Sequence, residues 1–375
     1  MQHNLGVIGL GHWFGWLEKG VGEKGSLKLV KAVGTKPFED KAKLLTGFGI
    51  TKDRYYISDP DGKIPEEFFE GLDLVHISDP NKFHKAQAIE SLEYGKRVIV
   101  EKTLAINERE FEEMKSFLKK KGMEDRIYLH LHYLHKQPTL ALAREMPGLV
   151  AKYGKITSIE ANFFEPVNEE DPRRTWLLAP ENGGIFMDWV HTSEIIFRMT
   201  KCSFGGIKKA SDFGVNTDYD SVNPTGVETV VEVSGSSYEN GALATMRMAK
   251  GTEKALANKT LRIVFKSGFS VFACFPGHEA EFNNAGARGT LKILDAKGKE
   301  ISSESLSGQN SSEIFISEIL DFCDGKRVGL NLDEITEIFK SQWEYQRTAG
   351  TRRLITDRES IDAFLRNGAS YTYCK

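Results

Sequence analysis

The sequence predicts a two-domain protein, with an α/β domain built on a parallel sheet over residues 1–135 and an α+β domain over residues 136–375. At 375 residues, the chain is longer than one hydrophobic core usually serves. Before about residue 135, short apolar segments alternate with amphipathic ones, which is typical of βαβ units and a parallel sheet. After that point strand-like segments follow one another, which indicates a large, mainly antiparallel sheet with an open face.

The first domain is expected to contain five apolar strands that alternate with helices. The expected strands are Leu5–Leu10, Leu27–Val33, Leu72–Ser78, Arg97–Val100 and Ile127–Leu131. The expected helices between them are Pro37–Gly47, Phe83–Tyr94 and Asn107–Lys121. The last of these begins with acidic residues and ends in lysines, which suits the helix dipole, so we interpret the lysines as a solvated helix end.

The second domain is expected to present a sheet with one polar face. The expected strands are Ile156–Phe164, Thr229–Ser234, Ala242–Met248, Leu261–Phe265, Val271–Cys274 and Thr290–Leu294. Polar and apolar residues alternate along several of them, for example around Arg247 and Arg262, so one face should be wet or lie between subunits. Helices Ser311–Cys323 and Leu332–Arg347 close the chain.

Composition argues against several classes of partner. The chain is 40% hydrophobic and 27% charged with a net charge of −3, so we expect neither nucleic acid nor an anionic membrane as a partner. The four cysteines are scattered without a Cys-x-x-Cys pair, which favours reduced thiols over a disulfide framework. The sequence has no apolar run of roughly eighteen residues and no basic-then-apolar leader, so we expect a soluble, cytoplasmic protein.

A glycine-rich turn follows the first expected strand. Gly9 and Gly11 stand at the first two positions of the dinucleotide fingerprint, where glycine allows a tight turn and close approach of a pyrophosphate to backbone N–H groups. His12, Trp13 and Phe14 follow, and Phe14 takes the third glycine's place, with a glycine one residue later. The turn and these residues are therefore candidates for cofactor binding, and the alternative is a turn that is structural alone.

The end of the second strand selects between NADP and NAD in such sites. An acidic residue there would bind the ribose 2′-hydroxyl of NAD. Here Thr35 and Lys36 occupy the position, and the first acid is Glu39. A hydroxyl and an ammonium both donate hydrogen bonds to a 2′-phosphate, so we favour NADP, with NAD possible and a plain surface role for Lys36 as the alternative.

A lysine follows the apolar strand that ends near Val100. Lys102, in Glu101-Lys102-Thr103, should therefore sit at the carboxyl edge of the parallel sheet, where open α/β sheets bind ligands. An ammonium beside a bound nicotinamide can contact the oxygen of a substrate that loses or gains hydride. This placement points to an oxidoreductase.

Four stretches together resemble the glucose–fructose oxidoreductase/inositol dehydrogenase (Gfo/Idh/MocA) family. They are the glycine turn, residues 79–84 (DPNKFH), residues 94–102 (YGKRVIVEK) and residues 183–191 (GGIFMDWVH). The resemblance implies a Rossmann domain followed by a substrate-binding and oligomerisation domain. It also implies that Lys102, Asp188 and His191 are catalytic, and that Asp79, Pro80, Asn81, His84 and Glu101 lie at the cofactor.

The chemistry of these residue types agrees with the resemblance. Alcohol oxidation needs a base for the hydroxyl proton and charge stabilisation at the developing carbonyl; His191 suits the first task and Lys102 the second. Asp188 lies at i, i+3 from His191, so it could orient substrate or favour the imidazolium. Two departures from the family pattern are Thr103 in place of proline and a spacing of three rather than four between Asp188 and His191. The alternative is that Asp188 caps the helix and His191 is a core histidine.

Other side chains are weaker candidates. His132 and Trp176 are expected at the substrate, and His84 could instead belong only to the first turns of its helix. Three histidines near residue 132 have a metal-like spacing, but no acid or thiol cluster completes a tetrahedral set, so no metal is expected.

The most favoured function is an NADP-preferring dehydrogenase or reductase acting on a sugar, sugar acid or cyclitol. The alternatives are a glycosidase that uses NAD for transient oxidation and a cofactor-binding regulatory protein without turnover. By resemblance we expect a homodimer or homotetramer formed through the carboxyl-terminal sheet.

Overall fold

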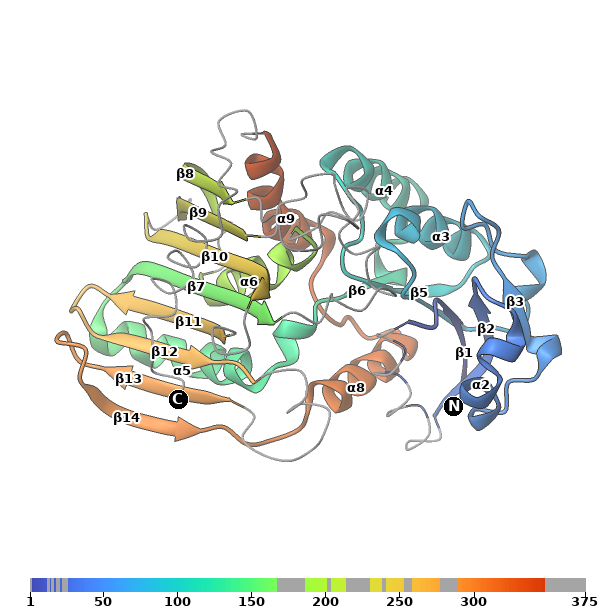
Figure 1. Ribbon diagram of the computed structural model, residues 1–375, viewed down its shortest axis with the longest axis horizontal. Helices are drawn as coiled ribbons and strands as arrows, with labels where there is room; N and C mark the ends of the chain where they lie inside the picture. The colour runs from blue at the N-terminus through green and yellow to red at the C-terminus, as the bar shows by residue number, and fades with distance from the viewer. Residues whose placement is uncertain are drawn as a thin grey trace. The chain divides into compact units, whose positions relative to one another are not determined.

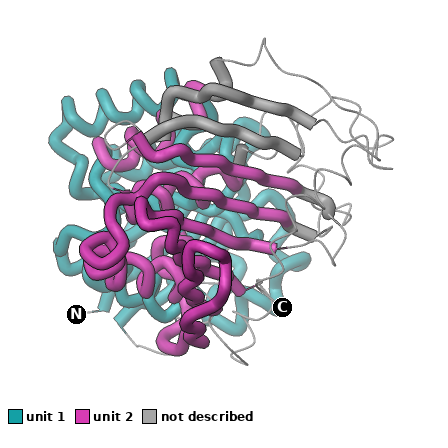
Figure 2. Tube along the Cα trace, turned by 90° about the vertical axis from the view of Figure 1, so that its left-hand side faces the viewer, with its two compact units in different colours: residues 1–131, 312–332 teal, residues 132–311, 333–375 magenta. Residues whose placement is uncertain are grey.

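The computed structural model describes residues 2–11, 14, 17, 21, 26–166, 186–200, 204–213, 230–237, 241–252, 258–276 and 289–347. The chain divides into two compact units (Figure 2). Unit 1 comprises residues 1–131 and 312–332, and unit 2 comprises residues 132–311 and 333–375. Within the described residues, no helix is long and apolar enough to cross a membrane.

Unit 1 is built on a six-stranded parallel sheet in the order β3-β2-β1-β4-β5-β6 (Figure 1). Its strands are β1 (His3–Ile8), β2 (Leu27–Gly34), β3 (Tyr55–Ile57), β4 (Leu74–Ile77), β5 (Arg97–Glu101) and β6 (Ile127–His130). Its helices are α2 (Ala42–Gly47), α3 (Asn81–Glu93), α4 (Glu108–Lys121) and α8 (Ser311–Cys323). From β1 the chain adds β2 and β3 on one side of the sheet, and β4, β5 and β6 then follow on the other side. In sheets of this kind, ligands bind at the carboxyl ends of the two strands where the order switches, here β1 and β4.

Local sequence explains the ends of α4. The Asn107 side chain accepts a hydrogen bond of 2.9 Å from the Glu110 N–H, and Gly122 ends the helix in the left-handed conformation with φ 63°. Acids occupy the first turn and lysines the last, so both ends suit the helix dipole, as expected from the sequence.

Helix α8 belongs to unit 1, although the sequence analysis places it in the second domain. Its residues Phe315, Ile316, Ile319 and Phe322 are buried in one cluster with core residues of β1, β2, β4 and β5. Figure 1 shows α8 on one side of this sheet and α3 with α4 on the other. The apolar face of α8 is needed to cover that side of the sheet, which is why the chain returns to unit 1. The first boundary also lies after Leu131 rather than after residue 135.

Unit 2 contains an eight-stranded mixed sheet in the order β14-β13-β12-β11-β7-β10-β9-β8, in which only the β7–β10 pair is parallel among the described pairings. The strands are β7 (Ile156–Pro166), β8 (Phe204–Phe213), β9 (Val230–Ser237), β10 (Leu243–Thr252), β11 (Asn258–Phe265), β12 (Ser270–Cys274), β13 (Thr290–Leu294) and β14 (Glu300–Ser305). Its helices are η5 (His132–His135), α5 (Gln137–Tyr153), α6 (Phe186–Thr200) and α9 (Leu332–Arg347).

The two faces of this sheet differ, as the alternation of residues predicts. Helices α5 and α6 contribute Leu142, Trp189 and Ile195 to a core that also contains inward residues of β7, β10 and β11. On polar positions of the strands, Arg262 lies 3.9 Å from Glu160, and both side chains are partly exposed. The expected mainly antiparallel, open-faced sheet is therefore confirmed.

Some elements escape the sequence analysis. Strand β3 is three residues long, and β14 is exposed along its whole length, so neither carries a periodic apolar signal. The predicted helix Pro37–Gly47 is shorter than expected, because only Ala42–Gly47 is α-helical. Cys323 is a free thiol, whereas Cys274 is disulfide-bonded, so the expectation of reduced thiols is wrong for Cys274.

Candidate active site

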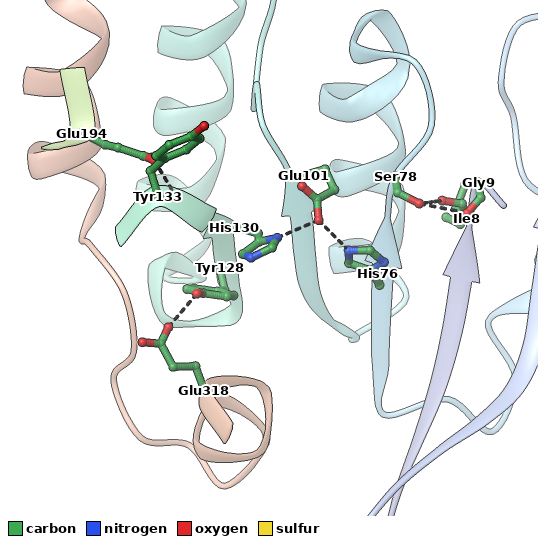
Figure 3. A network of polar contacts seen from close by, with 10 residues as sticks. All are labelled: Ile8, Gly9, His76, Ser78, Glu101, Tyr128, His130, Tyr133, Glu194 and Glu318. Carbon is green, nitrogen blue, oxygen red and sulfur yellow. Dashed lines mark hydrogen bonds and ion pairs between the residues drawn. The ribbon is translucent and has the colours of Figure 1, made fainter. Parts of the chain in front are cut away.

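The glycine-rich turn lies between the carboxyl ends of β2 and β4. The Gly9 N–H donates to the Val33 carbonyl at 3.0 Å, and the Ser78 hydroxyl donates to the Gly9 carbonyl at 2.8 Å (Figure 3). Gly9 has φ 91°, and a Cβ there would lie 2.7 Å from Ser78 C and Asp79 N. Only glycine fits this position, because both the backbone conformation and the close approach of β4 exclude a side chain.

Gly11 stands in a different environment. A Cβ at Gly11 would meet no atom within 4 Å, so neither packing nor φ requires glycine there. Bare backbone facing open space at the switch point of a parallel sheet is the arrangement that a pyrophosphate needs. The residues present therefore fit a dinucleotide.

The residues after Gly11 are only partly described. The Phe14 side chain is 2% exposed and packs edge-on against Phe48 in the core of unit 1, with ring centroids 5.5 Å apart. Its ring is therefore occupied by core packing. His12 and Trp13, the other cofactor candidates of this turn, lie outside the described residues.

Two lysines stand near the ends of β1 and β2. Thr35 and Lys36 are exposed, as a role in recognising a 2′-phosphate requires. The Lys41 ammonium donates to the Leu10 carbonyl of the glycine turn at 3.4 Å, a contact that the sequence analysis does not anticipate. Glu39, the first acid in sequence after β2, pairs with Lys52 at 2.7 Å. No sequence pattern distinguishes Lys41, because its place depends on how α2 lies beside the turn.

The loop after β4 is held by side chains of α3. The Asp79 carboxylate accepts a hydrogen bond of 2.9 Å from Gln87, and burial raises the pKa of Asp79 while Gln87 and His84 lower it. Pro80 precedes the first residue of α3, and Asn81 is 6% exposed. His84 is 1% exposed and contacts two backbone carbonyls, so its ring lies within the protein. Each predicted residue of this loop thus lies at the carboxyl edge of the six-stranded sheet of unit 1.

Glu101 lies in a buried network across three neighbouring strands. Its Oε1 accepts from His130 Nδ1 at 2.7 Å and lies 3.3 Å from His76 Nε2, and all three side chains are at most 2% exposed (Figure 3). His130 also stacks on Phe315 of α8, with ring centroids 3.6 Å apart. Burial by itself raises the pKa of Glu101, but interactions with His130 and His76 outweigh it and hold that pKa well below its usual range. Glu101 was predicted near the cofactor, and its side chain is turned into the core.

Lys102 directly follows this network. It is 5% exposed, Thr103 is 4% exposed, and the peptide between them is cis. The lysine leaves the carboxyl end of β5 beside the β4 loop, in the position that the sequence analysis expects.

In unit 2, helix α6 places an acid, a histidine and a second acid on one face. His191 Nε2 lies 3.6 Å from Asp188 Oδ1, and His191 Nδ1 lies 3.4 Å from Glu194 Oε1. The spacing of three residues therefore does bring Asp188 and His191 together. Glu194, which the sequence analysis misses, also accepts from the Tyr133 N–H at 2.9 Å and so ties η5 to α6. The i, i+3, i+6 repeat from Asp188 is the signal that could have identified it.

His132 packs against His191 from η5. The two rings meet edge to face with centroids 4.2 Å apart, and the Tyr133 ring lies 4.6 Å from His191. His191 is thus enclosed by carboxylates along the helix and by aromatic rings from η5. Trp176 and the paired glycines before α6 lie outside the described residues.

Comparisons with known proteins agree on the first domain and on the fold. A family model described as an oxidoreductase family with an NAD-binding Rossmann fold matches residues 4–125. The scyllo-inositol 2-dehydrogenase (NADP(+)) IolU of Bacillus subtilis is 45% identical over 104 residues, which cover 28% of this chain and 30% of that protein. The match therefore spans less than a third of that relative's length.

Solved structures extend the likeness to nearly the whole chain, at identities that show the fold alone. An aldose–aldose oxidoreductase from Caulobacter crescentus has a TM-score of 0.74 at 15% identity, covering 94% of this chain and 99% of that one. A myo-inositol 2-dehydrogenase from Lactobacillus plantarum has a TM-score of 0.70 at 17% identity, covering 94% and 98%. The 3-ketoreductase KijD10 from Actinomadura kijaniata, solved with NADP, has a TM-score of 0.68 at 14% identity, covering 95% and 100%.

Proposed function

We infer from the match of residues 4–125 to the Gfo/Idh/MocA oxidoreductase family model that this chain is a nicotinamide-dependent dehydrogenase or reductase. We propose that it prefers NADP and acts on a hydroxyl or carbonyl group of a sugar, sugar acid or cyclitol. The observation that carries the proposal is the turn at Gly9 and Gly11. It lies at the switch point of the parallel sheet, with Gly11 open to a ligand.

The preference for NADP rests on charge. Thr35 and Lys36 are exposed at the end of β2, Lys41 reaches the glycine turn, and the first acid after β2, Glu39, is paired with Lys52. Hydroxyl and ammonium donors suit a 2′-phosphate better than a free ribose hydroxyl. The relative from Bacillus subtilis is named for its use of NADP(+).

The substrate class rests on the relatives. Their names refer to inositols, aldoses and a keto group, all of which present a secondary alcohol or its carbonyl. When bound, the nicotinamide supplies the hydride acceptor or donor. The Lys102 ammonium is assigned a hydrogen bond to the reacting oxygen, which stabilises charge as the carbonyl forms.

His191 is assigned the proton transfer at that oxygen. It lies between the Asp188 and Glu194 carboxylates, which favour the imidazolium that forms when it accepts a proton. Asp188 is assigned the orientation of His191 and of substrate hydroxyls.

For the assembly, the polar positions of the sheet in unit 2 support a homodimer or homotetramer, which light scattering would test.

The test begins with fluorescence titration of the purified protein, freed of copurified cofactor, with NADPH and separately with NADH. We expect NADPH to bind tighter by at least about tenfold, which equals about 1.4 kcal/mol. A panel of inositols, aldoses and sugar acids with NADP+ then follows absorbance of the reduced cofactor. Tighter NADH binding would overturn the cofactor preference, and binding of neither would overturn the proposed activity.

A variant separates chemistry from binding. We expect Lys102→Ala to abolish turnover while NADPH affinity stays within about threefold, because the variant removes the interaction with the reacting oxygen. Lys85→Ala, at a partly exposed lysine on α3 paired with Glu113, is the matched control and should keep full activity. A near-normal rate in the Lys102 variant would end its catalytic assignment. Glycoside cleavage without net cofactor reduction would instead indicate transient redox chemistry.

A further inference from the structure

His84 joins two loops at the carboxyl edge of the parallel sheet. Its Nδ1 lies 2.7 Å from the Thr103 carbonyl oxygen, and its Nε2 lies 2.7 Å from the Asp79 carbonyl oxygen. Asp79 follows β4, whereas Thr103 follows Lys102 after β5. The ring comes from the first turns of α3 and is 1% exposed, so the ring itself is shielded from water.

These two contacts constrain the protonation of the ring. A carbonyl oxygen only accepts hydrogen bonds, so each ring nitrogen must carry a proton, and the neutral imidazole has only one. An unprotonated nitrogen at 2.7 Å would place its lone pair against the lone pairs of the carbonyl. Turning the ring over does not help, because it would bring C–H groups to a distance well below the usual ~3.3–3.6 Å of a C–H···O contact. Two contacts of this length are typical of charge-assisted hydrogen bonds.

The surroundings of His84 pull its charge in opposite directions. Burial lowers the pKa of His84 below its ordinary value, and the two carbonyl hydrogen bonds and the carboxylates of Asp79 and Glu101 offset that shift only in part. Asp79 comes from the loop after β4 and Glu101 from β5, so both neighbouring elements present negative charge to the ring. The two short contacts decide in favour of the imidazolium.

We propose that His84 is a positioning residue which, as a buried imidazolium, clamps the Asp79 and Thr103 carbonyls and thereby fixes the backbone that carries Lys102. Glu101 on the other side of the lysine is held by His76 and His130, so histidines secure both neighbours of Lys102. His84 does not act on substrate; it acts through Thr103. The catalytic consequence rests on the proposed function, in which Lys102 contacts the reacting oxygen.

The protonation state can be measured without any substrate. The protein is labelled with 15N at its nine histidines, and His84 is assigned by comparison with the His84→Gln variant. At the pH of maximal activity, or at neutral pH if no turnover is found, we expect both ring nitrogens to show one-bond coupling to a proton. A ring nitrogen without a proton under these conditions would overturn the clamp.

Positioning is tested by comparing His84→Gln with His3→Gln, which removes a histidine of β1 that pairs with Asp324 away from this loop. Loss of the His84 hydrogen bond to Thr103 should speed amide exchange over residues 102–104 in His84→Gln. Exchange over the same residues should be unchanged in His3→Gln. We expect kcat to fall at least about tenfold, or about 1.4 kcal/mol, with NADPH affinity within about threefold. Unchanged exchange over these residues would refute the positioning role, whatever the turnover.

The pH profile separates this role from a merely structural one. If the bonded form is the imidazolium, wild-type kcat falls as pH rises through the folded pKa of His84, because one carbonyl bond is then lost. We expect this fall of kcat with rising pH to disappear in His84→Gln, whose amide does not titrate. If the same fall persists unchanged in the variant, another group causes it. Absence of turnover in wild type would defeat the proposed function, while the coupling and exchange measurements would still decide the clamp.

Discussion

Replacing Glu101 by glutamine tests how much the buried network beside Lys102 contributes to the stability of unit 1. Glu101→Gln keeps the shape of the side chain and removes its charge. The carboxylate is 2% exposed, so solvent does not screen its contacts with His130 and His76 at 2.7 and 3.3 Å. The variant therefore isolates the charge of a fully buried acceptor.

The expected loss follows from the contacts. Hydrogen bonds to a charged group contribute about 1.5–3 kcal/mol each, and breaking a buried charge pair costs about 3–5 kcal/mol. Because the glutamine oxygen can still accept one bond from His130, we expect unfolding free energy to fall by about 3 kcal/mol. For a unit of this size that lowers Tm by about 6–12 °C.

Thermal unfolding followed by circular dichroism and by calorimetry measures this change. Glu113→Gln is the matched control, because Glu113 is an exposed glutamate paired with Lys85 at 2.7 Å, and its Tm should stay close to that of wild type. A Tm for Glu101→Gln equal to that of the control at pH 7 would refute the argument that the network stabilises the fold.

The dependence on pH gives a second check with a definite sign. The pKa of Glu101 is held well below its ordinary value of 4.5, so the folded state favours the carboxylate. Its stabilisation is fully present above the unfolded pKa and is lost as pH falls toward the folded pKa. The difference in Tm between wild type and Glu101→Gln should be constant near neutrality and shrink below about pH 4.5. A difference that grows on acidification would contradict this assignment.

Three further predictions follow from the same structure. Gly11→Ala should fold with an unchanged Tm but bind NADPH at least about tenfold more weakly, whereas Gly9→Ala, at φ 91°, should lower the Tm itself. Equal NADPH affinity and equal Tm in the two variants would contradict the assignment of Gly9 to the fold and Gly11 to the cofactor. Phe315→Ala should destabilise unit 1 by about 3–5 kcal/mol in urea unfolding, because its fully buried ring packs in the core of that unit, and a loss under about 1 kcal/mol would remove α8 from this core. Burial raises the pKa of the Cys323 thiol to about 12, so native protein at pH 8 should label with a thiol reagent much more slowly there than urea-unfolded protein does, and equal rates would refute this.

The sequence by itself determined the features that local patterns encode. Short apolar runs that alternate with amphipathic ones located most strands and helices of unit 1, and the Gly9 turn and Lys102 followed from their places after such strands. These residues are predictable because a parallel sheet brings the carboxyl ends of its strands to one edge. The polar face of the second sheet was predictable for a similar reason, since alternation along one strand is a local property.

Tertiary structure decided what depends on packing between distant segments. The sequence predicts Glu101 near the cofactor, and the fold decides that its side chain turns inward, because His76 and His130 on the adjoining strands provide its hydrogen bonds. Lys41 contacts the glycine turn because α2 lies beside that turn. Helix α8 packs in the first unit because Phe315 and its apolar neighbours cover one face of the sheet. None of these partners is near in sequence, so no periodicity signals them. Burial and pairing across strands, which exist only in the folded chain, select them.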